Sequence, residues 1–267
     1  MRRRSVPAAL IAVALVAVLL LLGPLVALLL NIPWGRAVEL ITADEATEAF
    51  GLSLTTALVS TVLCIVLGLP LSLWMVDMMR RHPRWGDALQ LIIYAPLVLS
   101  PVVSGLALVF FWGRHGLVGE WLDDSFGVRV AFTSLAVIVV QVFVSLPFFV
   151  STTVTSLRGV PPVVQEAARV DGASRWQTLW RITVPLAGPG IAAGTVLGFA
   201  RALSEYGATL TFAGNVAGET RTIPLLIELG LSSNDMDQAL GACILLLGIY
   251  VLVVGGIATT TLLRRKR

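Results

Sequence analysis

Long apolar stretches are the feature of this sequence that most limits how it can fold. The hydrocarbon core of a membrane is about 30 Å thick, and a helix needs about 20 apolar residues to cross it. Six stretches reach this length, at about 6–30, 50–76, 88–112, 131–156, 183–206 and 239–263. The sequence therefore predicts an all-α membrane protein with six transmembrane helices, built as one membrane domain over residues 1–267.

Composition supports this assignment. Only 13% of the residues are charged and 57% are hydrophobic, whereas soluble proteins carry roughly 25% charged residues. The basic residues are separated by apolar stretches, so no nucleic-acid-binding patch is expected. We expect the protein to lie in the plasma membrane as a multi-pass protein, in contact with membrane lipid.

The first apolar stretch follows Arg2, Arg3 and Arg4, a pattern that is also typical of a cleaved signal peptide. Its apolar core is longer than the 7–15 residues of a typical signal peptide, and no small-residue cleavage site follows it. We therefore interpret it as a retained helix.

The distribution of positive charge predicts the orientation. Both ends of the chain and the loops at 77–87 and 158–181 hold most of the 19 basic residues, and the other loops hold only Arg36, Arg114, Arg129 and Arg221. Because positive residues mark the cytoplasmic side, both termini and the loop at 158–185 are predicted to be cytoplasmic.

Metal and cofactor chemistry is not indicated. Cys64 and Cys243 lie within apolar stretches, and His82 and His115 lie in separate loops. A zinc site needs clustered ligands, and no phosphate-binding loop of the type G-x-x-x-x-G-K-[ST] occurs. No metal, no cofactor and no intrinsic enzymatic activity are expected.

A short polar segment, QEAARVDGASRWQTLWRITVP at 165–185, interrupts the apolar pattern. Pro161 and Pro162 suit the start of a helix over 163–171, and Gly172 suits a left-handed stop. Ser174 is a plausible N-cap for a second helix, on which Trp176, Leu179, Trp180 and Thr183 are predicted to share one face. The segment is either an ordinary interfacial loop or a short helix that a cytosolic protein binds.

The fifth span combines small and charged residues on one face. Gly190, Gly194 and Gly198, together with Arg201 and Glu205, fall within an arc of roughly 80° on a helix. Small residues allow close helix packing, and charges within a membrane usually face a bundle interior or a water-filled path. Arg201 and Glu205 therefore form either a structural ion pair or part of an anion pathway.

Two further polar pairs occur at helical spacing. They are Ser100 with Ser104, and Gln141 with Ser145. Such residues form interhelical hydrogen bonds or line a pore. Pro96, Pro101 and Pro147 are positioned to break these helices, which is tolerated only where protein or water satisfies the freed backbone.

The polar segment resembles the EAA motif in the permease subunits of bacterial ABC importers. Glu166, Ala167 and Ala168 are followed after three residues by Gly172, and after nine more by I-x-V-P, where the family pattern ends in I-x-L-P. In that family the loop is a coupling helix that sits in a cleft of a cytosolic ATPase. The resemblance implies this role for the segment Glu166–Gly172, including Arg169 and Asp171.

The resemblance extends over about residues 50–263. The segments PLVLSPVV at 96–103, GRHGLVG at 113–119, FARALSEYGAT at 199–209 and GETRTIP at 218–224 are similar to the permeases of molybdate importers. Sulfate and thiosulfate permeases are close relatives. Ser100 and Ser204 depart from the molybdate pattern, where proline and glycine are usual.

The resemblance implies a type I ABC importer permease fold and a particular assembly. The expected assembly is a homodimer with two copies of an ATP-binding subunit and an extracytoplasmic oxyanion-binding protein. Molybdate or tungstate is the expected cargo, with sulfate or thiosulfate as the alternative. A secondary transporter, a channel and a membrane anchor for a cytosolic complex are the other classes that the sequence leaves open.

Overall fold

The computed structural model describes residues 7–265, and every regular element in that range is a helix. Five helices are long and apolar enough to cross a membrane. They are α1 (Ala8–Asn31), α3 (Asp44–Arg81), α7 (Ser134–Arg158), α10 (Val184–Leu203), which continues directly from α9 and a π-helical turn, and α13 (Met236–Arg265). A helix satisfies its own backbone hydrogen bonds, which is the requirement that lipid imposes on a spanning segment.

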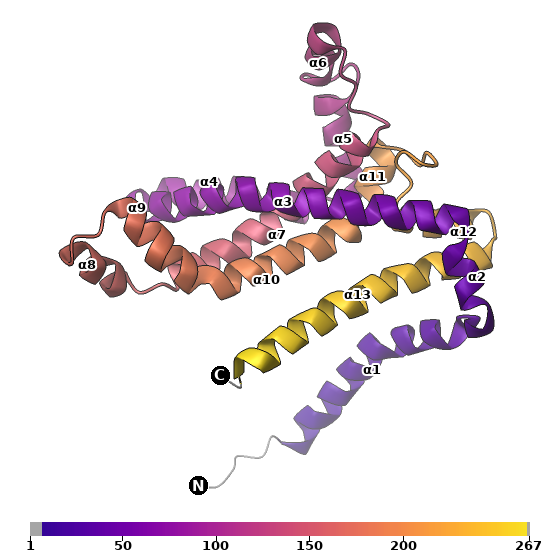
Figure 1. Ribbon diagram of the computed structural model, residues 1–267, viewed down its shortest axis with the longest axis horizontal. Coiled ribbons are helices and arrows are strands. Elements are labelled where there is room, and N and C mark those ends of the chain that lie inside the picture. The colour runs from indigo at the N-terminus through magenta and orange to yellow at the C-terminus, as the bar shows by residue number, and fades with distance from the viewer. Residues whose placement is uncertain (1–6, 266–267) are drawn as a thin grey trace.

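The centre of the molecule is formed by α3, α7 and α10, which run side by side (Figure 1). Glycines allow these helices to approach closely. A Cβ atom on Gly68 of α3 would lie 2.5 Å from the ring of Phe149 on α7, and one on Gly194 of α10 would lie 3.1 Å from the Phe149 carbonyl oxygen. The predicted glycine face of the fifth span is therefore the face that packs against α7.

The third predicted span, at 88–112, is two helices rather than one. α4 (Pro83–Val98) and α5 (Pro101–Trp112) meet at an angle of 111°. Proline disfavours helical geometry at the preceding residue, and both Leu99 (ψ 139°) and Ser100 (ψ 150°) are extended. Pro101 thus ends one helix and opens the next, whereas Pro147 lies inside an unbroken α7.

Shorter elements close the two ends of the bundle. They are η1 (Trp34–Arg36), α2 (Ala37–Thr42), α6 (Gly119–Phe126), α8 (Pro162–Val170), α9 (Arg175–Thr178), the π-helical turn η2 (Leu179–Thr183), α11 (Gly207–Phe212) and α12 (Ile223–Ser232). α8 and α9 lie at one end of the long axis, and α2 and α12 lie toward the other (Figure 1). α5 and α6 project away from the bundle.

An arginine ties the first part of the chain to the last helix. Arg36 Nη1 lies 2.7 Å from Asp237 Oδ2 at the start of α13, and Arg36 Nε lies 3.1 Å from Glu39 Oε2. The hydrogen bond from Arg36 holds the pKa of Glu39 below its ordinary value. α1 begins and α13 ends toward the side of the molecule that carries α8 (Figure 1).

Candidate functional site

The segment between α7 and α10 forms a short helix, a tight turn and a second helix. α8 begins at Pro162, one residue before the predicted start, and Gly172 follows it with a φ of 87°. This left-handed geometry is accessible to glycine without strain, as predicted. Proline at the first turn and glycine after the last turn are local signals, so the sequence alone specifies this helix.

α8 has two different faces. Val163 and Val170 are 70% and 87% exposed, and Glu166 and Ala167 on the same side are also exposed. Gln165, on the opposite side, is only 8% exposed. Exposed valines on a polar loop outside the apolar spans form a surface suited to another protein.

The second helix begins as predicted and then changes its geometry. Ser174 and Gln177 form a capping box, and Trp176 packs edge-on against Trp180 with ring centroids 5.5 Å apart. The prediction that Thr183 shares the tryptophan face is wrong, because η2 adds a residue to the turn. Thr183 is buried, and its hydroxyl donates to the carbonyl oxygen of Thr178, five residues earlier, at 3.3 Å.

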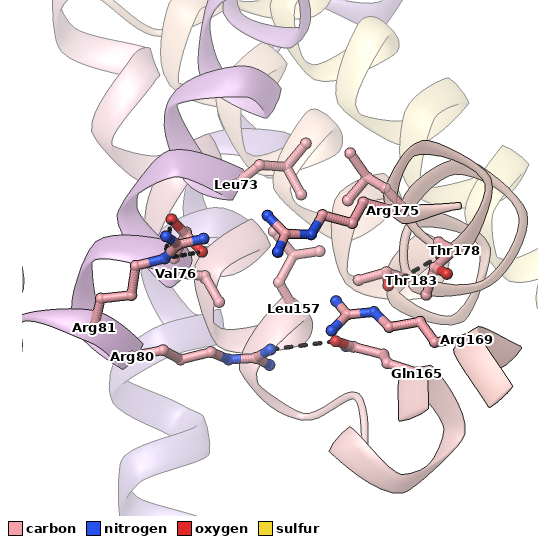
Figure 2. Close-up of a pocket in the computed structure, with 12 residues that line it drawn as sticks. Leu73, Val76, Arg80, Arg81, Leu157, Gln165, Arg169, Arg175, Thr178 and Thr183 are labelled. Atoms are coloured by element: carbon pink, nitrogen blue, oxygen red, sulfur yellow. Dashed lines mark hydrogen bonds and ion pairs between the residues drawn. The ribbon is translucent and has the colours of Figure 1, made fainter. Parts of the chain in front are cut away.

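A cavity of about 440 Å³ lies behind α8 (Figure 2). Its walls come from the end of α3, the end of α7, α8, α9 and η2. Arg80 on α3 donates to Gln165 Oε1 at 3.3 Å, and Arg81 pairs with Asp77 at 2.9 Å. Arg169 faces this cavity rather than the valine side of α8, which separates it from the other predicted coupling residues.

Three of the other predicted coupling residues lie on a third side of α8, away from both the cavity and the valine side. Ala168, Asp171 and Gly172 line a second hollow of about 320 Å³ together with Ala173 and Gln177 of the same loop. Sequence reasoning did not single out Gln165 or Arg80. The signal that could have found them was the prediction that loops 77–87 and 158–181 lie on the same side of the membrane.

Arg201 and Glu205 form the predicted ion pair. Their side chains meet at 2.6 Å, with 26% of the Arg201 side chain and 1% of the Glu205 side chain exposed. Glu205 Oε1 also accepts a hydrogen bond of 2.8 Å from the backbone N–H of Ala208 at the start of α11. Glu205 therefore holds both the arginine and the following helix, and only Arg201 keeps access to the surface.

The residues of the two predicted polar pairs lie in different environments. Gln141 is buried and accepts a hydrogen bond of 2.9 Å from Ser60 on α3, which favours the interhelical alternative over a pore lining. Ser145 is also buried, and its hydroxyl has no partner among the described residues. Ser104 is buried in α5, whereas Ser100 is exposed and caps α5 by accepting from the Val103 N–H at 3.3 Å.

Comparison with known proteins identifies the family. The model of the family described as "Binding-protein-dependent transport system inner membrane component" matches residues 68–267. The molybdenum transport system permease protein ModB of Mycobacterium bovis is 42% identical over 238 residues, which are 89% of this chain and 88% of that protein. The sulfate transport system permease protein CysT of Escherichia coli is 33% identical over 244 residues, covering 90% of this chain and 87% of that protein.

The fold agrees with a solved structure. A chain of a bacterial alginate ABC transporter, solved in complex with an alginate-bound periplasmic protein, superimposes with a TM-score of 0.73 over 92% of this chain and 91% of that chain, at 23% identity. The predicted all-helical permease fold is thus confirmed. From these matches, this chain belongs to the family of inner-membrane components of binding-protein-dependent transport systems and is a multi-pass membrane protein.

Proposed function

We propose that this chain is the permease subunit of an ATP-driven importer of molybdate, with tungstate as a second cargo. The observation that carries the proposal is the 42% identity to a molybdenum permease over 89% of the chain, against 33% to a sulfate permease over a similar length. The sequence contains no phosphate-binding loop. ATP hydrolysis is therefore assigned to a separate subunit.

The proposed assembly is a homodimer of this chain with two ATPase subunits in the cytoplasm and an oxyanion-binding protein outside. In this proposal both termini and α8 lie in the cytoplasm, which is the side that the distribution of basic residues predicts for them. Residues 1–267 form a single transmembrane permease domain in this proposal.

α8 is proposed to be the coupling helix. Its exposed side carries Val163, Glu166, Ala167 and Val170, which together offer an apolar surface and one carboxylate to a groove of the ATPase. Ala168, Asp171 and Gly172 border the adjoining hollow. ATP binding would close the two ATPase subunits, move α8 and open the pathway outward, and hydrolysis would return it inward.

Arg201 is proposed to supply positive potential to the anion pathway. It is a partly exposed basic group on an apolar helix, and the buried Glu205 fixes its position. A fixed positive charge of this kind attracts a dianion most strongly where water is scarce. Ser100 at the helix break is the exposed serine among the proposed pathway residues, whereas Ser104, Gln141 and Ser145 are buried in the helix packing.

A sulfate or thiosulfate importer is the second candidate, favoured by the similarity to the sulfate permease. Molybdate and sulfate are both tetrahedral dianions, so charge and hydrogen-bonding geometry alone do not separate them. The two candidates share every structural feature described above and differ only in cargo.

The test is uptake of radiolabelled molybdate in cells that lack this protein, with and without the gene restored. A hundredfold excess of sulfate serves as the competitor, and an equal excess of tungstate serves as the positive control for competition. Restored uptake that resists sulfate and yields to tungstate is the expected result.

Uptake that sulfate abolishes would assign the chain to sulfate transport. Uptake that persists after mutation of the ATPase nucleotide site would instead indicate a secondary transporter or a channel. Absence of any rescue, with the protein present in the membrane at normal amounts, would contradict the proposal.

A further inference from the structure

The cavity behind α8 has a composition that the coupling role does not explain. It is lined by the basic residues Arg80, Arg81, Arg169 and Arg175, and by a single acidic residue, Asp77. Its volume of about 440 Å³ equals the space of roughly fifteen water molecules at about 30 Å³ each. The cavity is therefore large enough for a small polyatomic anion with part of its hydration shell.

Three of the four arginines in the cavity have no carboxylate partner among the described residues. Asp77 is engaged by Arg81 at 2.9 Å. Within the part of the chain that the structure describes, no carboxylate lies within 4 Å of Arg80, Arg169 or Arg175. Figure 2 shows these three side chains extending from α3, α8 and α9 toward the same space.

A buried amide provides independent evidence for a missing acceptor. Gln165 is 8% exposed, and its Oε1 accepts from Arg80 Nη1 at 3.3 Å. A guanidinium group only donates hydrogen bonds, so the amide oxygen must face Arg80. The amide nitrogen, Nε2, therefore points away from Arg80. It is buried and has no hydrogen-bond partner among the described residues. A buried amide N–H group normally has an acceptor.

We propose that this cavity binds a tetrahedral oxyanion of the phosphate class. Arg80, Arg169 and Arg175 would supply charge-assisted hydrogen bonds, and Gln165, whose Oε1 is held by Arg80, would form part of the same wall. Guanidinium groups match the paired oxygens of such an anion better than other side chains do. The anion is either a free ion of the cytosol or the phosphate of an anionic lipid headgroup, and the chemistry of recognition is the same for both.

An anion in this position would connect elements that otherwise make few contacts. Arg80 belongs to α3, whereas Gln165 and Arg169 belong to α8. Occupancy would therefore restrain α8 relative to the transmembrane bundle. An effect on transport rests on the proposed function, but binding itself does not.

The experiment measures binding on the full-length chain in nanodiscs, without transport. In phosphatidylcholine discs, inorganic phosphate is titrated at constant ionic strength against chloride, and thermal unfolding is followed. A ligand that binds only the folded state raises the unfolding temperature in a concentration-dependent way. We expect phosphate to raise it and chloride to leave it unchanged. A second arm replaces phosphatidylcholine by phosphatidylglycerol in the absence of phosphate.

Variants locate the effect in this cavity. Arg169→Ala and Arg175→Ala are each expected to weaken phosphate binding by about tenfold or more, because each removes a charge-assisted hydrogen bond. Arg84→Ala is the matched control, because Arg84 is an exposed basic residue at the start of α4 that does not line the cavity. It is expected to leave binding unchanged.

Gln165→Glu separates binding from folding. The new carboxylate keeps the size of the side chain, accepts from Arg80 and repels an anion, so the variant is expected to fold normally and to lose the response to phosphate. Stabilisation of the wild type by phosphate identifies the bound anion as a free ion. Stabilisation by phosphatidylglycerol alone, which the same variants lose, identifies it as a lipid headgroup.

Absence of both effects in the wild type would overturn the proposal. Equal responses in Gln165→Glu and in the wild type would also overturn it. In that case the arginines serve a carboxylate of a docked protein instead, which would be visible as an ATPase interaction that Arg169→Ala weakens.

Discussion

Glu205 is the most deeply buried charged side chain among the residues that the structure describes. Its environment explains how a carboxylate is tolerated there. A buried charge is costly unless it is paired and hydrogen-bonded. Glu205 meets Arg201 at 2.6 Å with one oxygen and the Ala208 N–H at 2.8 Å with the other. The carboxylate thus links the end of α10 to the start of α11.

Removal of this carboxylate is expected to destabilise the fold. Glu205→Ala leaves the arginine without its partner and the Ala208 N–H without its acceptor, so we expect a loss of about 3 kcal/mol in the free energy of unfolding. Glu205→Gln keeps an acceptor oxygen for Ala208 and should lose less. Thermal and denaturant unfolding in detergent measure both changes.

Glu120→Ala is the matched control, because this exposed carboxylate forms no ion pair with any of the residues that the structure describes. Its effect should stay within about 0.5 kcal/mol. Equal stability of Glu205→Ala and Glu120→Ala would contradict the structural role. Arg201→Lys keeps the positive charge. Its rate of uptake, divided by the amount of folded protein, then tests the proposed role of Arg201 in the anion pathway.

At the scale of elements, glycine positions determine which helices can touch. α5 leaves the bundle at the break formed by Leu99 and Ser100 and packs against α11. This contact depends on Gly105, where a Cβ atom would lie 2.6 Å from Thr211 Cβ and 3.0 Å from the Ala208 carbonyl oxygen. The angle of α5 is therefore held by packing as well as by Pro101.

Gly105→Ala is expected to lower the free energy of unfolding by about 1–3 kcal/mol, because the added methyl group overpacks the contact between α5 and α11. Gly51→Ala is the control, since nothing lies within 4 Å of the corresponding Cβ position in α3. That change should be neutral or stabilising by up to about 1 kcal/mol. The prediction fails if both variants unfold at the same denaturant concentration.

α8 is the second element with a prediction of its own. Val170 is 87% exposed on the face that we propose binds the ATPase. Val170→Ser removes apolar area from that interface without a cost to the fold, so less ATPase should copurify with the permease and uptake should fall several-fold. Quantitative copurification after crosslinking measures the first effect.

Val128→Ser is the matched control, because Val128 is an exposed valine in the loop after α6, distant from α8 (Figure 1). It should leave both copurification and uptake unchanged. Unaltered copurification in Val170→Ser, with Glu166→Ala also unaltered, would place the ATPase contact elsewhere on the molecule.

At the scale of the whole molecule, the proposed orientation is the property that most needs a direct measurement. α8 and the 77–87 loop lie at one end of the bundle, and α2 and α12 lie at the other (Figure 1). The excess of arginine at the first end predicts that it is cytoplasmic. This prediction concerns the membrane insertion of the chain as a whole.

Single-cysteine labelling tests the orientation. Cys64 and Cys243 are free and are first replaced by alanine. In sealed spheroplasts a membrane-impermeant maleimide is expected to label Ser125→Cys, and to label His82→Cys only after permeabilisation. Both positions are exposed in the structure. The reverse labelling pattern would invert the topology and move α8 outside.

Much of the fold could be predicted because the signals are local. Apolar length against the thickness of a membrane predicts the spans. Pro162, Gly172 and the Ser174 cap predict the helix–turn–helix between α7 and α10 from neighbours in the chain. The family was also readable from the spacing of Glu166, Gly172 and Pro185. None of these features depends on a distant residue.

Other features depend on contacts between residues far apart in the sequence. Gln141 meets Ser60 across 81 positions, and Gln165 meets Arg80 across 85. Neither pairing follows from periodicity, because each depends on how α3 packs against α7 and α8. The π-helical turn that turns Thr183 away from the tryptophans was missed because 3.6-residue periodicity was assumed.

The sequence by itself determined the membrane helices and the short helix between the fourth and fifth spans, because helix formation and capping depend on nearby residues and on the solvent. It also determined membership of the permease family, because the motif is a spacing of residues along the chain. The tertiary structure alone decided the 111° angle between α4 and α5, the dual role of Glu205 and the arginine-lined cavity. These features arise where separate helices meet, and their geometry is set by side-chain packing rather than by local propensity.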